Sequence, residues 1–92
     1  MRREEFYQLP MLVQDYLVYI EAIKGHSELS VIEYAGDLRT FFRYIVRQKG
    51  LFPASAEDSE LDLTVIDIEF IKTITLNDAY QFLIYCKNVR KN

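Results

Sequence analysis

The stretch VIEYAGDLRTFFRYIVRQ, residues 31–48, places apolar side chains at the three- and four-residue spacing of one helix face. It predicts a long amphipathic helix that begins at residue 28 or 31, ends at residue 48 and is closed by Gly50. Ser27 and Ser30 are both suitable N-caps, and Ser30 also fits a capping box, so the sequence leaves the first turn open. The predicted apolar stripe comprises Val31, Tyr34, Ala35, Leu38, Phe41, Phe42 and Ile45.

A second amphipathic helix is predicted before this stretch, over residues 9–24. Pro10 suits its first turn, where a missing N–H costs no hydrogen bond, and Gly25 suits the position just past its end. Lys24 and His26 should then lie in the loop between the two helices. The predicted apolar face of this helix comprises Leu9, Leu12, Val13, Tyr16, Leu17 and Ile20.

After the central helix, residues 51–64 lack helical periodicity and predict a loop. A short helix over residues 68–73 follows an Asp67 cap, and a longer one over residues 76–89 follows a Thr75 cap. The longer helix is apolar on two sides, which requires two partners. One stripe comprises Leu76, Ala79, Tyr80, Leu83 and Cys86, and the other comprises Phe82, Tyr85 and Val89.

These segments predict an all-α fold, a small bundle of about four helices in one domain spanning residues 1–92. Residues 61–68 alternate briefly between apolar and polar side chains, and they are the one place where a strand is arguable. Half of the residues are hydrophobic, which is enough for a core. No apolar run reaches the roughly 20 residues of a membrane helix, and residues 1–5 do not begin a signal peptide. We expect a cytoplasmic protein with no membrane partner.

The residues that support catalysis elsewhere are sparse in this chain. His26 is the only histidine and has no Cys or carboxylate partners at metal-ligand spacing, so we expect no metal site. Cys86 is the only cysteine and lies on an apolar stripe, which predicts an inert buried thiol. The glycines are isolated, so no phosphate-binding loop is indicated. We expect no cofactor and no catalytic residues.

Charged side chains are unevenly distributed along the chain, whose net charge is −3. Residues 39–49 carry basic side chains and no acid, whereas residues 57–62 carry acids and no base. Positive and negative regions are therefore expected to be separate. Arg39, Arg43 and Arg47 recur at four-residue spacing and should form a ridge on the central helix, with Tyr44 beside it at the surface. A solvated helix face explains the same pattern. Further basic candidates are Lys24, His26, Lys87, Arg90 and Lys91.

The order of the residues resembles the N-terminal core-binding (SAM-like) domain of the tyrosine recombinases, particularly Xer-like recombinases and phage integrases. The first helix carries Tyr16-Leu17, and the turn reads Lys24-Gly25-His26-Ser27, with Ser30 where the family usually has Thr. The central helix then carries Tyr34, Asp37-Leu38 and Phe42. Residues 74–78, Ile-Thr-Leu-Asn-Asp, precede Phe82-Leu83 and Tyr85 as in the family's last matched helix. The resemblance covers nearly the whole chain.

This resemblance implies a DNA-binding module that clasps duplex DNA, while a separate C-terminal catalytic domain cleaves and joins strands. Its partners would be double-stranded DNA and other recombinase protomers, in DNA integration or chromosome segregation. The DNA-contacting candidates are Lys24, His26, Ser27, Ser30, Arg39, Arg43, Tyr44 and Arg47. The family carries a further basic helix, so this bundle is expected to lack its last helix. The stripe of Phe82, Tyr85 and Val89 would then be exposed or covered by self-association.

Two other readings of the residues stay open. The first is a free-standing helical protein–protein interaction module that uses the apolar face of residues 76–89. The second is a small transcription regulator, although residues 51–64 are long for a helix-turn-helix connection. Salt dependence separates the first from DNA binding, because phosphate contacts weaken steeply as salt rises and apolar contacts do not.

Overall fold

A computed structural model describes residues 6–90 of the chain; residues 1–5, Lys91, Asn92 and the side chain of Arg90 lie outside this description. The helices are α2 (Met11–Ala22), α3 (Glu28–Gln48), α4 (Ile68–Ile71) and α5 (Leu76–Tyr85). The π-helical turn η3 (Cys86–Arg90) continues α5. Within residues 6–90 there is no strand, which confirms the all-α prediction. The alternating residues 61–68 instead contain the 3₁₀ turn η2 (Leu63–Val65).

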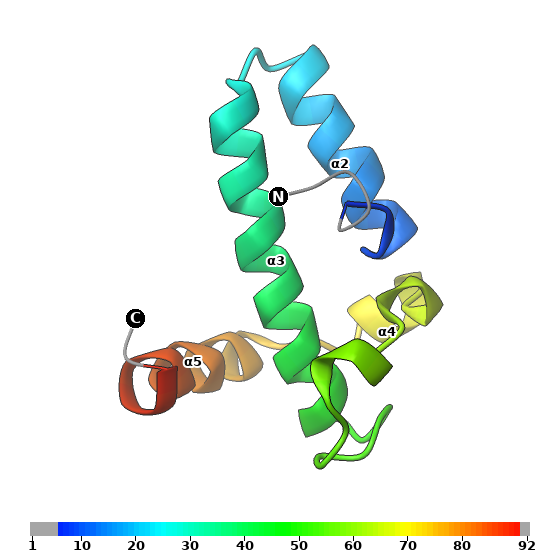
Figure 1. Cartoon of the computed structure of the whole chain (residues 1–92), viewed down its shortest axis with the longest axis vertical. Helices are drawn as coiled ribbons and strands as arrows, with labels where there is room; N and C mark the ends of the chain where they lie inside the picture. The colour runs from blue at the N-terminus through cyan, green and yellow to red at the C-terminus, as the bar shows by residue number, and fades with distance from the viewer. Residues whose placement is uncertain (1–5, 91–92) are drawn as a thin grey trace.

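Helices α2 and α3 form an antiparallel hairpin in the upper half of the molecule (Figure 1). The chain reverses at Gly25, whose φ of 74° is a left-handed conformation that a side chain would strain. Ser27 caps α3 by accepting a hydrogen bond from the Ser30 backbone N–H at 3.1 Å, which resolves the choice between the two serines. Local turn chemistry therefore sets the direction of the long helix.

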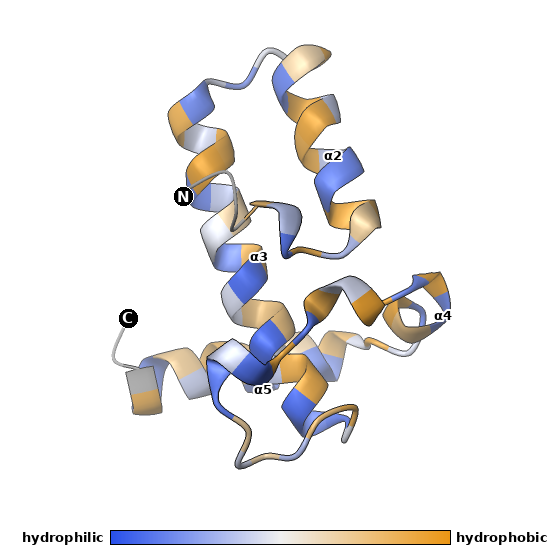
Figure 2. Ribbon diagram, turned by 45° about the vertical axis from the view of Figure 1, so that its right-hand side comes forward, coloured by the Kyte–Doolittle hydropathy of each residue, from blue (hydrophilic) through white to orange (hydrophobic). Residues whose placement is uncertain are grey.

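The core lies along the hairpin and below it, where Leu61, Leu63 and Ile66 join the buried cluster formed by residues of α2 and α3. Hydrophobic and hydrophilic residues alternate along the ribbons of both helices (Figure 2). Leu12 and Tyr16, predicted as core, are instead exposed, because the buried face of α2 is narrower than the predicted one. The buried hydrophobic residues are Leu9, Val13, Leu17, Ile20, Ala35, Phe42, Ile45, Val46, Leu61, Leu63 and Ile66.

Helix α5 crosses the lower part of α3 at a steep angle (Figure 1). Its first turn is held by a capping box, in which Thr75 and Asp78 bond each other's backbone N–H groups at 2.8 and 3.2 Å. The ring centroid of Phe82 lies 5.1 Å from that of Phe41 and 5.4 Å from that of Tyr44. These aromatic contacts attach α5 to α3.

The prediction for the two sides of this helix was wrong for Phe82 and Tyr85. Both are half-buried against α3, with the Tyr85 ring 4.9 Å from Tyr44, so neither is fully exposed. Val89 is exposed, as predicted. The exposed apolar face of α5 comprises Leu76, Tyr80, Leu83 and Ile84. In the described part of the chain, no helix has the length and hydrophobicity to cross a membrane.

Candidate nucleic-acid interface

The eight predicted DNA-contacting residues lie in two groups on α3 and the turn before it. Ser30 and Arg39, the nearest members of the two groups on α3, are 9 residues apart, or about 14 Å at about 1.5 Å per residue. The turn group comprises Lys24, His26, Ser27 and Ser30, and the helix group comprises Arg39, Arg43, Tyr44 and Arg47. The structure therefore supplies two separate basic sites rather than one.

The turn group lies at the exposed end of the hairpin. The Ser27 hydroxyl both caps α3 and donates to the Ser30 hydroxyl at 3.1 Å, so capping uses part of its bonding capacity. The His26 ring lies edge-on to Tyr34, with centroids 5.8 Å apart. Lys24 is exposed beside them, while Glu28 adds a negative charge in the first turn of α3. The group is accessible, but its net charge is low.

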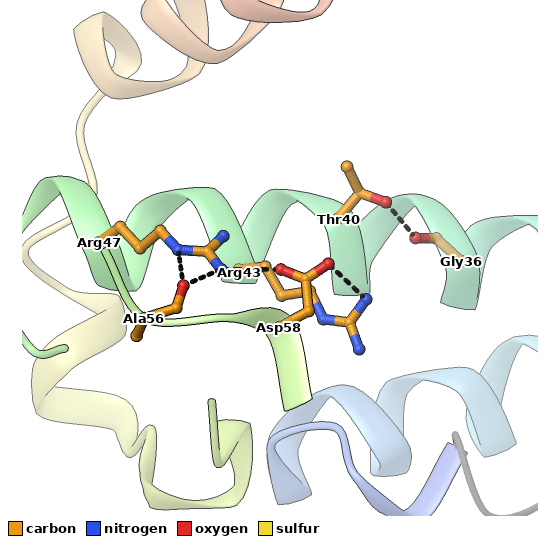
Figure 3. A network of polar contacts seen from close by, with 6 residues as sticks. All are labelled: Gly36, Thr40, Arg43, Arg47, Ala56 and Asp58. Atoms are coloured by element: carbon orange, nitrogen blue, oxygen red, sulfur yellow. Dashed lines mark hydrogen bonds and ion pairs between the residues drawn. The ribbon is translucent and has the colours of Figure 1, made fainter. Parts of the chain in front are cut away.

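The helix group does not stand apart from the acidic loop, contrary to the predicted separation of charges. The chain folds back so that Asp58, in the 3₁₀ turn η1 (Asp58–Glu60), meets two of the arginines (Figure 3). Arg47 Nη2 donates to Asp58 Oδ1 at 2.8 Å, and Arg43 Nη1 lies 3.5 Å from Asp58 Oδ2. Charges that are distant in sequence are thus paired in space.

Arg47 is held by the loop backbone as well as by the carboxylate. Its Nε and Nη2 atoms donate to the Ala56 carbonyl oxygen at 3.2 and 2.7 Å (Figure 3). The side chain of Arg47 is 23% exposed, against 57% for Asp58. The guanidinium is therefore the inner, fixed member of the pair and the carboxylate is the outer member.

These residues border a recess of about 290 Å³ on the side of α3. A water molecule has a share of about 30 Å³ in the liquid, so the recess has room for a phosphate group with its solvent. Its walls carry three guanidinium groups, two phenols and a hydroxyl against a single carboxylate. The lining residues are Arg39, Thr40, Arg43, Tyr44, Arg47, Asp58 and Tyr85.

Tyr44 is not the free surface residue that its position off the apolar stripe predicts. Its ring packs between α3 and α5 against Phe82 and Tyr85, and the residue is half-buried. Burial, together with the nearby charge of Asp78, raises the pKa of the Tyr44 phenol. Tyr44 therefore stays a neutral hydroxyl that lines the recess while its ring supports the helix contact.

The arginines also act on the carboxylate. The hydrogen bond from Arg47, reinforced by the charges of Arg43 and Arg39, lowers the pKa of Asp58 below its ordinary value. The carboxylate is therefore ionised at neutral pH, and charge-assisted hydrogen bonds hold it in place.

Sequence reasoning missed the wall residues Asp58, Thr40 and Tyr85. Thr40 lies one turn before Tyr44 on α3, and its hydroxyl donates to the Gly36 carbonyl at 3.1 Å. Its position between Arg39 and Arg43 was a usable signal. Asp58 gave no such signal, because its contacts with residues 11 and 15 positions away pass through an irregular loop and leave no periodic pattern in the sequence.

No group of three or more His, Cys, Asp or Glu side chains within the described residues is arranged to hold a metal ion. Cys86, predicted to be buried, is a half-buried free thiol at the end of α5. What the described side chains offer chemically is an anion-binding arrangement of guanidinium and hydroxyl groups.

No protein-family model matches the chain, and no solved structure matches it. The chain is 31% identical over 88 residues to the tyrosine recombinase XerC of Caldanaerobacter subterraneus subsp. tengcongensis, a match that includes 96% of the chain. The chain spans about a quarter (25%) of the length of this curated relative. The chain is therefore related in sequence to a tyrosine recombinase over a minor part of that enzyme.

Proposed function

We propose that the chain is the N-terminal, DNA-clasping core-binding domain of a tyrosine site-specific recombinase. In this proposal it holds duplex DNA while a catalytic domain of the parent protein, outside these residues, performs strand exchange with other protomers. The observation that carries the proposal is the 31% identity to a tyrosine recombinase along 96% of the chain. The all-helical fold and the resemblance of its hairpin turn to the N-terminal recombinase pattern agree with it.

DNA contact is assigned to the two basic groups, one in the turn before α3 and one on α3. Lys24 and the Ser27–Ser30 turn offer a cation, hydroxyls and backbone N–H groups to the phosphate backbone. Arg39, Arg43 and Arg47 offer guanidinium groups from the recess. With a net charge of −3, the chain alone should bind weakly, and the parent protein supplies the remaining affinity.

The test is the affinity of the 92-residue chain for a fluorescent duplex, measured by anisotropy over a range of salt concentrations. Two or more phosphate contacts predict a loss of affinity of about tenfold or more between roughly 50 and 200 mM salt. Absence of binding at the lowest salt, or binding that does not change with salt, contradicts the DNA-binding proposal.

One observation favours the interaction module as a second candidate. The outer face of α5 is a continuous apolar surface, with Leu76 68% exposed and Leu83 61% exposed, and such faces mark contact sites for proteins. A Leu83→Glu variant that keeps the fold and the DNA affinity but loses a complex that the wild-type chain forms with a protein partner would assign this face to protein contact. An unchanged complex would remove this candidate.

A further inference from the structure

Asp58 occupies the hydrogen-bond donors that a phosphate would use. The recess is lined by three arginines and one carboxylate. The carboxylate bridges Arg43 and Arg47 with one oxygen toward each, as two oxygens of a phosphate do. The acidic side chain therefore stands where an anionic ligand would bind.

The geometry allows this carboxylate to leave without disturbing its surroundings. Arg47 keeps both of its hydrogen bonds to the Ala56 carbonyl when Asp58 is absent, so its guanidinium stays oriented. The turn that carries Asp58 is held by other contacts, because the Glu60 carboxylate accepts the Glu57 N–H at 2.8 Å. The Asp58 side chain is 57% exposed, and ion pairs of that exposure contribute little to stability.

We propose that the recess is a site for one backbone phosphate of DNA, and that Asp58 is an internal competitor that the phosphate displaces. This inference rests on the proposed DNA-binding function. A phosphodiester binds the same donors as Asp58 and brings the rest of the duplex with it, so it replaces the carboxylate when the other contacts form. Asp58 thus lowers affinity for isolated phosphates and makes binding at the recess depend on the remaining interface.

The experiment compares the wild-type chain with Asp58→Asn, using duplex anisotropy over a range of salt concentrations. Asparagine keeps the shape of the side chain and removes its charge. The variant is expected to bind several-fold more tightly at a similar salt slope, because the same phosphate contact forms in both proteins and only the competing carboxylate is lost. Circular dichroism and urea unfolding confirm that the turn and the fold are retained.

The matched control is Glu69→Gln, which changes the net charge equally at an exposed site on α4, where Glu69 contacts Lys72 at 3.6 Å. Equal tightening in both variants reflects net charge alone and overturns the competitor role. If the wild type binds duplex and Asp58→Asn binds it with the same affinity, this inference is overturned and the proposed function stands. Absence of binding by either protein overturns both.

A second arm separates DNA from small anions. Inorganic phosphate is titrated into Asp58→Asn while the Arg47 Nε–H signal is followed by NMR, and duplex DNA is titrated in parallel. Perturbation of the signal by duplex at concentrations where inorganic phosphate has no effect supports the backbone-phosphate site. Perturbation by inorganic phosphate but not by duplex assigns the recess to a free anion and overturns the proposal.

Discussion

Single carboxylates have distinct structural roles in this chain, and Asp78 shows the clearest one. It accepts the Thr75 N–H at 2.8 Å at the start of α5, and it lies 3.0 Å from Lys49 Nζ at the end of α3. The same Lys49 ammonium donates to the Thr73 carbonyl at 3.1 Å. One side chain thus closes a helix end and connects it to a second helix.

The contacts of Asp78 predict a dependence of stability on pH. The Thr75 N–H, and after it Lys49, lower the pKa of the Asp78 carboxyl from its ordinary value of 3.8. A carboxyl whose folded pKa is depressed contributes stability above the unfolded pKa, and this stability is lost as the pH falls through the folded value. We therefore expect wild type to lose more stability than Asp78→Asn between neutral pH and a pH below the ordinary value.

Urea unfolding of both proteins at several pH values measures this difference, and NMR titration of Asp78 measures its pKa directly. Lys49→Met is the companion variant, and it should raise the Asp78 pKa part of the way, because the Thr75 N–H remains. An Asp78 that titrates at or above 3.8 in the folded chain would refute the proposed contacts.

At the scale of helices and loops, what the sequence predicts depends on how local the signal is. Helix positions were predictable from caps such as Asp67 and Thr75 and from Gly25, because each acts within a few residues. The face that α5 turns to α3 was not predictable, because its two apolar stripes look equivalent in the sequence until a packing partner is known. The recess was missed for the same reason: it requires the loop that carries Asp58 to fold back on α3.

The docking of α5 yields a prediction for two neighbouring side chains. Phe82 contacts Phe41 and Tyr44, whereas Leu83, one residue later, is 61% exposed. Phe82→Ala should destabilise the fold by about 2 kcal/mol, less than a fully buried Phe because the ring is only half-buried. Leu83→Ala should change the stability by no more than about 0.5 kcal/mol.

Urea unfolding at low protein concentration measures both changes. The pair is comparable, because both substitutions remove a large apolar side chain in the same helix turn and affect opposite faces. If Leu83→Ala costs as much as Phe82→Ala, the outer face of α5 is covered in solution, and the assignment of its two faces is wrong.

At the scale of the whole molecule, the proposed DNA-binding function makes the two basic groups separate contacts on one ligand. Ser27 and Arg39 are 12 residues apart on and beside α3, about 18 Å along the helix axis. The binding free energies of sites so far apart add independently when the two sites contact different phosphates of that ligand. The net charge of −3 keeps nonspecific attraction low, so individual contacts should be measurable.

Under the proposed DNA-binding function, Lys24→Gln and Arg39→Gln should each reduce the slope of log affinity against log salt by about 0.9. The double variant should show the sum of the two changes in binding free energy, because the turn and the recess contact different phosphates. Lys72→Gln, at an exposed site just past the end of α4 and in neither group, removes the same charge and should leave the slope unchanged. If all three variants reduce the slope equally, DNA affinity depends on the total charge of the chain, and neither group is a specific contact. If only Arg39→Gln reduces the slope, the recess alone contacts phosphate and the turn serves to cap α3.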